Sequence, residues 1–289
     1  MNQQHDPSPK PAHESAFQAM PLSLMAGSEG LLEAEGDWPD AVAAVMSCRT
    51  GGVSRPPFDS FNLGDHVGDL PAAVASNRAA FAGRLAVRPV FLRQVHGTRV
   101  VELGPDSADG LEADACWTSR RGLACTVMVA DCLPLLLSAP DGSSVAAVHA
   151  GWRGLLGRDG MGVLESLCES WPAARTRSQR EKLRVWLGPC IGPEAFEVGA
   201  EVRAGFLAHD SQAAPAFRPL APTSGGKYLA DLPALARMRL ARLGVQHVAG
   251  NDGSRTWCTV SNDSIFFSHR RDAARLGSTG RMVACIWRR

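Results

Sequence analysis

The strongest constraint on the fold is a set of short apolar runs that recur along the chain. Several of them are almost continuously apolar rather than alternating, which is typical of strands that are covered on both faces. The length of 289 residues is enough to bury a sizeable core around such strands. The predicted strands are 41–48, 90–95, 123–129, 133–137, 145–149, 183–187 and 282–287.

Helical segments are predicted between these strands. In 71–85, Val74, Phe81 and Leu85 form one apolar stripe, and 228–243 carries a similar stripe that ends at Gly244. Weaker patterns predict helices at 160–171 and 193–208. The chain shows no internal repeat and no convincing linker. The interleaved elements predict a single mixed α/β (or α+β) domain.

The first part of the chain lacks this patterning. Residues 1–37 mix proline, polar residues and isolated apolar residues without a sustained period, so we expect a disordered N-terminal tail followed by one domain over 38–289, with the first element near Ala41. The tail has no basic segment followed by an apolar one, so it does not resemble a secretory signal.

The amino-acid composition restricts the kinds of partner that this protein can bind. The 30 basic and 29 acidic side chains give a net charge of +1, which provides no global attraction to nucleic acid or to a membrane surface. No run is long and apolar enough to span a membrane. Eight cysteines are too sparse for a disulfide scaffold in a chain of this length. We therefore expect a cytoplasmic protein with a small-molecule partner.

Three residues stand at the ends of apolar runs, next to glycine-bearing turns: His96, Cys132 and His149. Two imidazoles and a thiolate can hold a zinc ion and leave a fourth position open, as in catalytic zinc sites. No C-x-x-C, H-x-H or H-E-x-x-H motif occurs, so the spacing alone also allows structural histidines. A metal-free alternative makes Cys132 a nucleophile and either histidine its base, with Asp131 orienting the imidazole.

Asp131 is the acidic candidate within this group. Because a buried carboxylate needs a partner, it forms a salt bridge with an arginine or takes part in proton transfer. Phosphate or another polyanion would require basic groups near the glycine turns. The predicted substrate-binding residues are Arg49, Asn62, Arg78 and Arg153, and Arg270 and Arg271 are further basic groups near these turns.

Longer motifs resemble a known family. From about residue 40 to the C-terminus the chain reads, in order, CRTGGVSRPPFDSFNLGDHVGDLPAAVASNR, RQVHGTRVV, ADACWTSRRGLACTVMVADCLPLLL, AVHAGWRG, LGPCIGPEAFEVGAEV, YLADL, WCT, FFSHRRD and TGR. These resemble the YfiH-like family, whose members are known as polyphenol oxidases (laccases) and as purine nucleoside phosphorylases. His269 stands where the family commonly has tyrosine, and the N-terminal tail is longer than usual.

The resemblance implies a zinc ion held by His96, Cys132 and His149. It also implies layered mixed β-sheets flanked by helices, similar to bacterial cysteine-hydrolase toxins. The implied activity is phosphorolysis of adenosine, inosine, guanosine and methylthioadenosine, together with adenosine deamination. Purine nucleosides and phosphate are then the partners, and the protein is a monomer or a homodimer.

Three other functions stay open. A copper-dependent polyphenol oxidase is the second interpretation, although eight histidines, of which His5 and His13 lie in the tail, are few for a multicopper enzyme. The others are the metal-free Cys/His hydrolase and a protein that binds a ligand without turnover. The H-x-E and P-C-x-x-C signature of one class of zinc deaminases is absent from the sequence.

Overall fold

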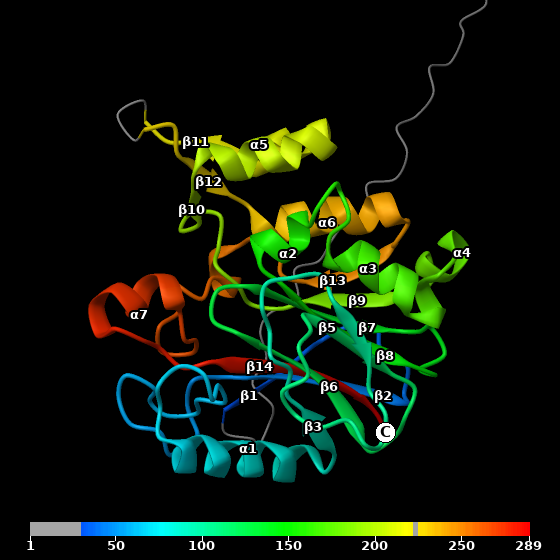
Figure 1. Cartoon of the computed structure of the whole chain (residues 1–289), viewed down its shortest axis with the longest axis vertical. Coiled ribbons are helices and arrows are strands. Elements are labelled where there is room, and N and C mark those ends of the chain that lie inside the picture. The colour runs from blue at the N-terminus through cyan, green and yellow to red at the C-terminus, as the bar shows by residue number, and fades with distance from the viewer. Residues whose placement is uncertain (1–29, 222–224) are drawn as a thin grey trace, which may run out of the picture.

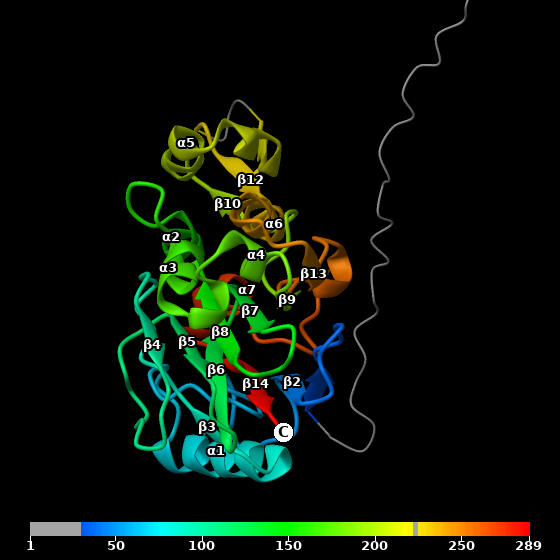
Figure 2. The ribbon, with the colours of Figure 1, turned by 90° about the vertical axis from the view of Figure 1, so that its right-hand side faces the viewer.

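Two β-sheets packed face to face form the centre of the molecule, with helices against their outer faces (Figures 1 and 2). The computed structural model describes residues 30–221 and 225–289. A third, small sheet and helix α5 lie at one end of this sandwich. The predicted mixed α/β architecture with layered sheets is confirmed. None of the helices in the described residues is long and apolar enough to cross a membrane.

The strands pair in a mixed topology. The five-stranded sheet has the order β1 (Leu31–Glu33), β2 (Val42–Ser47), β14 (Met282–Arg288), β6 (Leu123–Val129) and β3 (Arg88–Val90). The six-stranded sheet has the order β13 (His247–Gly250), β9 (Arg184–Leu187), β7 (Leu133–Ser138), β8 (Val145–Ala150), β5 (Ala115–Thr118) and β4 (Val100–Glu102). The small sheet has the order β10 (Glu197–Val198), β12 (Tyr228–Ala230) and β11 (Phe217–Pro219).

Alternate side chains along the central strands pack on opposite faces of their sheet and so belong to different apolar layers. On β8, Val148 packs beneath the helices, whereas Ala147 packs between the two sheets. On β14, Ala284 lies between the sheets and Val283 faces α1. Both faces of each sheet are therefore buried, which explains why these strands read as continuous apolar runs.

Helices cover the two outer faces. Helix α1 (Pro71–Leu85) packs on the five-stranded sheet through Phe81 and Leu85. The six-stranded sheet is covered by α3 (Val163–Ser170) and α6 (Leu232–Leu243). The remaining helices are α2 (Trp152–Leu156), α4 (Arg177–Arg180), α5 (Ala200–His209), α7 (His269–Leu276) and the 3-10 turns at Pro172–Ala174, Ser211–Ala216 and Arg255–Trp257.

The predicted boundary of the N-terminal tail is wrong at its C-terminal end. Strand β1 pairs antiparallel with β2, with Leu31 opposite Ser47, and both Leu31 and Leu32 are buried. The side chain of Trp38 donates to the carbonyl of Ala34 and packs against the layer between the sheets. Leu31, Leu32 and Ala34 are therefore part of the core. Residues 1–29 lie outside the described part of the chain.

Four predicted elements differ from their expected bounds by three residues or more. The helix predicted at 160–171 is α3, which begins at Val163. Strand β3 ends at Val90, because the backbone beyond it bonds to the 109–113 loop instead of to a sheet neighbour. Helix α6 begins at Leu232, after strand β12, where the Asp231 carboxylate accepts from the amide of Ala234 and caps the helix. Helix α5 begins at Ala200, and the preceding residues form a loop and β10.

A polar network ties the 49–64 loop to helix α1. The buried side chain of Asn77 accepts from the amide of Val53 at 2.9 Å. Its amide group donates to the Ser54 hydroxyl and to the carbonyls of Ser60 and Asn62 at 2.9–3.1 Å. One side chain therefore satisfies several buried groups of a loop that has no regular structure.

We expect Asn77→Ala to destabilise the protein by about 2–4 kcal/mol, because it leaves buried backbone groups without partners. Chemical denaturation would measure the loss. The matched control is Ser76→Ala, an exposed position on the same helix, which should change the free energy of unfolding by less than about 0.5 kcal/mol. Equal stability of the two variants would contradict the importance of this network.

Candidate functional site

The structure brings His96, Cys132 and His149 together. His96 lies in the loop after β3, Cys132 immediately precedes β7, and His149 is in β8. Their donor atoms all lie within 4.8 Å of one another, and Cys132 Sγ is 3.6 Å from His96 Nε2. This is the only group of three or more metal-ligating side chains in 30–221 and 225–289.

The donor geometry fits a metal ion. A tetrahedral ion about 2.3 Å from sulfur and about 2.0 Å from nitrogen holds these two atoms roughly 3.5 Å apart. The observed separation between Cys132 and His96 is close to that value. A Cβ at Gly151 would lie 2.9 Å from the His96 ring and 3.1 Å from Cys132 Sγ, so a residue without a side chain is required beside the donors. With three protein donors, a fourth position is left for water or substrate.

A buried carboxylate that our sequence analysis missed, Asp114, orients both histidines. Its Oδ1 lies 2.8 Å from His149 Nδ1 and accepts from the backbone amide of His96 at 2.9 Å. Its Oδ2 accepts from the amides of Gly97 at 2.7 Å and Val95 at 3.2 Å. His96 has a φ of +60°, a left-handed conformation that these bonds stabilise. The sequence signal is a single acidic residue directly before the buried strand β5.

The charges of the group are coupled. Burial raises the pKa of the Cys132 thiol, but His149 and His96 more than offset this and lower it to about 6. Burial lowers the pKa of His149, whereas Cys132 and Asp114 raise it to about 9. Without a metal ion, a thiolate therefore lies beside a protonated imidazole. The same preference for the thiolate favours metal binding.

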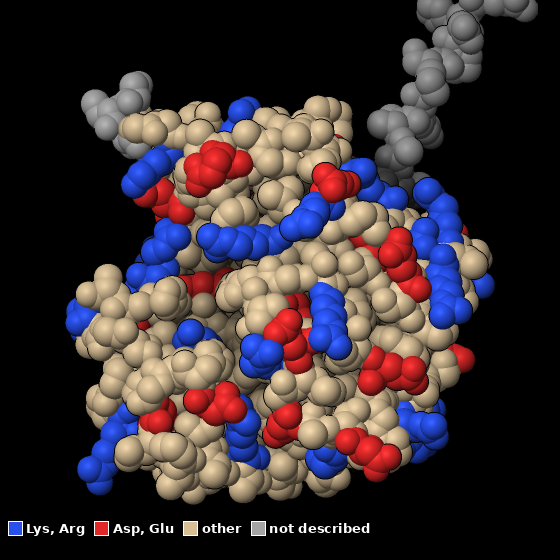
Figure 3. All heavy atoms as spheres, viewed as in Figure 1, with Lys and Arg blue, Asp and Glu red and all other residues tan. Residues whose placement is uncertain are grey.

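The three donors lie on the wall of a cavity of about 530 Å³. In Figure 3 the surface is hollowed between the part that carries α5 and the part that carries α7, with basic side chains along the upper rim. The lining combines apolar and cationic side chains. Its members include His66, Gln94, Met128, Asp131, Trp152, Arg153, Ile191, Phe196, Leu232, His269, Arg270 and Arg281.

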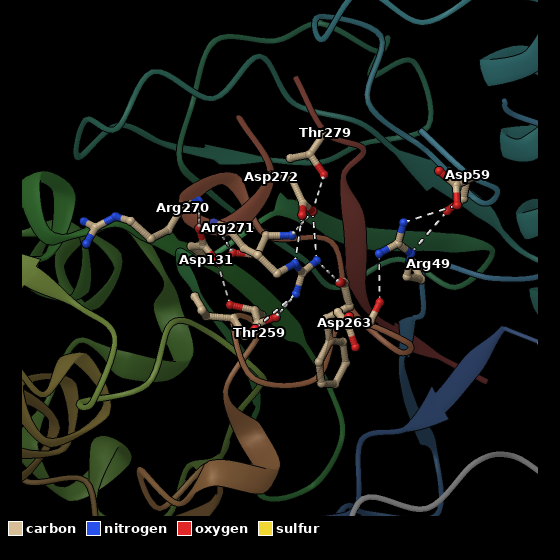
Figure 4. Close-up of polar contacts among 12 residues, drawn as sticks. Arg49, Asp59, Asp131, Thr259, Asp263, Arg270, Arg271, Asp272 and Thr279 are labelled. Atoms are coloured by element: carbon tan, nitrogen blue, oxygen red, sulfur yellow. Dashed lines mark hydrogen bonds and ion pairs between the residues drawn. The ribbon is translucent and has the colours of Figure 1, made fainter. Parts of the chain in front are cut away.

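Asp131 does not have the role expected in the metal-free alternative, because Asp114 and not Asp131 contacts the imidazole of His149. Figure 4 shows Asp131 beside Thr259 and Arg270. Its carboxylate accepts from the Thr259 hydroxyl and from the backbone amide of Arg270, each at 2.6 Å. Oδ2 therefore holds the start of α7, and Oδ1 the segment around Thr259, against the loop that carries Cys132. The expected partner, an arginine side chain, is replaced by a backbone amide.

Of the four predicted substrate-binding residues, Arg153 lines the cavity and the other three do not. Arg78 stacks 4.0 Å from the Phe91 ring centroid and donates to the carbonyl of Leu63. Arg49 binds the backbone carbonyl and the carboxylate of Asp59, as Figure 4 shows. These arginines stabilise loops, because their donors are used within the protein.

Asn62 is fully buried and acts on the backbone. Its Oδ1 accepts from the amides of Gly64 at 2.9 Å and Arg281 at 2.8 Å. The structure instead adds Arg270, Arg281 and His66 to the cavity wall. Arg281 belongs to the TGR motif, for which the sequence alone indicates no role. Only tertiary packing shows that it reaches the cavity.

In protein stripped of metal, we expect iodoacetamide to alkylate Cys132 selectively, with a rate that rises through a pH of about 6 as the thiolate forms. Burial raises the pKa of Cys48 to about 12 and that of Cys168 to about 11, so these thiols should react far more slowly. Mass spectrometry of digested protein would locate the label, with Cys132→Ser as the control. Labelling of Cys168 before Cys132 would contradict the assignment.

The chain is similar to known proteins over most of its length. The family model described as multi-copper polyphenol oxidoreductase laccase matches residues 43–289. The Shigella flexneri protein named purine nucleoside phosphorylase YfiH is 47% identical over 251 residues, covering 86% of this chain and 95% of that protein. The Haemophilus influenzae protein named purine nucleoside phosphorylase is 43% identical over the same length.

Solved structures share the fold. The crystal structure of the Neisseria meningitidis protein NMB0706 has a TM-score of 0.78 and 39% identity, covering 90% of this chain and 99% of its own. The Bacillus licheniformis protein YfiH has a TM-score of 0.80 and 29% identity, covering 91% of this chain. Matches in both sequence and structure extend over nearly the whole described chain. The chain therefore belongs to the YfiH-like family.

Proposed function

We propose that this protein is a zinc-dependent purine nucleoside phosphorylase. The observation that carries the proposal is the group of His96, Cys132 and His149, which leaves an open metal position on the wall of a cavity. The cavity volume of about 530 Å³ lies in the range of roughly 300–1,000 Å³ typical of small-ligand sites. The names of the relatives supply the substrate class.

The rest of the cavity suits a nucleoside. Ile191, Phe196 and Leu232 provide an apolar surface on which a flat purine can pack. Cationic side chains on the same wall can hold an oxyanion. A bound zinc ion supplies a Lewis acid that polarises an oxygen or nitrogen of the substrate. Asp114 contributes indirectly, because it keeps the other nitrogen of His149 hydrogen-bonded and the ring oriented.

The multicopper interpretation has less support. Two imidazoles and a thiolate can also bind copper, so copper competes for the same position. A multicopper oxidase needs a further cluster rich in histidine, and the described residues bring together one group of three donors. We therefore propose chemistry at a single ion, and the copper-loaded protein is one arm of the test.

Adenosine deamination is a second proposed activity, but among the described residues the cavity has no carboxylate that is free to transfer protons. A zinc-bound water that attacks the purine ring needs a nearby group to carry protons. Asp131 is the acidic residue of the cavity lining, and both of its oxygens accept hydrogen bonds. This arrangement favours phosphorolysis over deamination.

Product analysis of adenosine tests the reaction. With phosphate, the zinc-loaded protein should release adenine and ribose 1-phosphate, and without phosphate adenine should not form. Inosine would report deamination. Cys132→Ala should lose both metal and activity, whereas Cys168→Ala, which removes a cysteine outside the cavity lining, should keep both. Activity that survives complete metal removal would favour the metal-free Cys/His hydrolase.

The variant Asp114→Asn tests whether the Asp114 carboxylate orients the metal-binding residues. The amide keeps the shape but cannot accept a hydrogen bond from His149 and from three backbone amides as an ionised carboxylate does. We expect zinc affinity to fall about 10–100-fold, measured by competition with a chromogenic chelator. Asp106→Asn, at an exposed turn, is the control and should bind zinc as the wild type does. Unchanged affinity in Asp114→Asn would show that this carboxylate does not support the site.

A further inference from the structure

Arg281 is a cavity residue whose guanidinium is only partly used by the protein. Its Nη1 donates to the carbonyls of Thr279 at 3.0 Å and Gly280 at 3.2 Å. Within the described residues, Nε and Nη2 have no hydrogen-bond partner, and no carboxylate lies within ion-pair distance. The side chain is half-buried and lines the cavity together with Cys132 and Asp131.

The chain holds Arg281 rigidly from two sides. Asn62 Oδ1 accepts from its backbone amide at 2.8 Å, and the amide of Leu63 donates to its carbonyl at 3.1 Å. A Cβ at Gly64 would lie 2.7 Å from Arg281 Cγ, so the side chain can pass only because this residue is glycine. Strand β14 begins at the next residue. The guanidinium is therefore presented from a fixed backbone, which is typical of a preorganised binding group.

The other arginines of the cavity lining differ from Arg281. Arg270 donates to the carbonyls of Ala195 at 3.2 Å and Glu197 at 3.1 Å. Arg153 is exposed and lies 4.4 Å from the Trp152 ring centroid. Arg281 thus combines partial burial with unpaired donors.

The surroundings of Arg281 favour an anion. Burial lowers its pKa, while the negative charges of Cys132 and Asp131 oppose that effect. Neither group forms an ion pair with Arg281 in the described residues: Cys132 is a proposed metal ligand, and the Asp131 carboxylate accepts hydrogen bonds from Thr259 and from the amide of Arg270. A partly desolvated guanidinium with no acidic group in direct contact is stabilised further when a ligand brings a negative charge into hydrogen-bond distance.

We propose that Arg281 binds the phosphate that attacks the nucleoside, through paired hydrogen bonds from Nε and Nη2 to two phosphate oxygens. The planar guanidinium matches the spacing of those oxygens. This inference rests on the proposed phosphorylase function. A phosphate oxygen bonds to C1′ of the ribose as the bond from C1′ to the purine nitrogen breaks. The electron pair of that bond leaves with the purine, and the proton of hydrogen phosphate ends on it.

The first measurement is phosphate binding to the zinc-loaded full chain without nucleoside, by isothermal titration calorimetry. Arg281→Gln should weaken phosphate binding about 10–100-fold, the loss expected for charged hydrogen bonds. Arg275→Gln removes the same charge from an exposed site outside the cavity lining and should bind phosphate as the wild type does. Wild-type phosphate affinity in Arg281→Gln overturns the proposal.

Steady-state kinetics separates a phosphate role from a structural one. Arg281→Gln should raise the KM for phosphate by a similar factor and leave the KM for adenosine and the zinc content within about twofold. An equal rise in both KM values overturns the proposal, because it indicates a general change in the cavity. If phosphate binds in an Arg281-dependent way but adenosine is not cleaved, the anion site stands and the phosphorylase function fails.

A second variant and a second ligand complete the test. If Arg281→Gln folds poorly, Arg281→Lys keeps the charge but not the planar fork and should bind phosphate with intermediate affinity. Wild-type affinity in this variant overturns the paired geometry. Adenosine 5′-monophosphate tests whether the phosphate that Arg281 binds belongs to a nucleotide rather than being free inorganic phosphate. If it binds through Arg281 and inorganic phosphate does not, the site serves a phosphorylated nucleoside and the proposal is wrong.

Discussion

The carboxylate of Asp114 is the interaction on which the site depends. It is completely buried and accepts hydrogen bonds from three consecutive amides of the 95–97 loop as well as facing His149. A buried carboxylate is stabilised by these donors, and removing the carboxylate would leave all of them without their partner. The loop that carries His96 and the ring of His149 are thus held by the same two oxygen atoms. The metal-donor group is therefore preorganised by the protein.

The register between β7 and β8 places the third metal donor, Cys132. Strands β7 and β8 pair antiparallel, with Leu133 opposite Ala150 and Pro134 opposite His149. Cys132, one residue before β7, therefore lies beside Gly151, whose missing side chain leaves room for the sulfur. Because both strands are buried on both faces, a one-residue slip in this register would move every side chain of the shifted strand into the opposite apolar layer. The stability of the sandwich and the geometry of the donors are thus linked.

In and around the 49–64 loop, polar residues near the cavity stabilise the backbone instead of binding a ligand. Asn62 and Arg49, which were predicted to bind substrate, and Asn77 of α1 all satisfy backbone groups. Their effect on the cavity is indirect, because Asn62 holds the amide of Arg281. Backbone groups buried without regular structure need such partners. Two arginines that do line the cavity are Arg281, directly before β14, and Arg270, in α7.

The sequence alone predicted seven strands of the sandwich, since continuous apolar runs such as 123–129, 133–137 and 145–149 are stable only where both faces are covered. It did not predict the short strands β1, β4, β5 and β13. It also indicated His96, Cys132 and His149, because polar residues at strand ends next to glycine turns are where sites form. Spacing could not join them, since strand pairing and not local geometry brings them within 4.8 Å. The tertiary structure decided which acid orients the histidines and which arginine faces the cavity. Asp114 and Arg281 acquire these roles through contacts with segments far away in the chain, as in the pairing of Arg281 with Asn62.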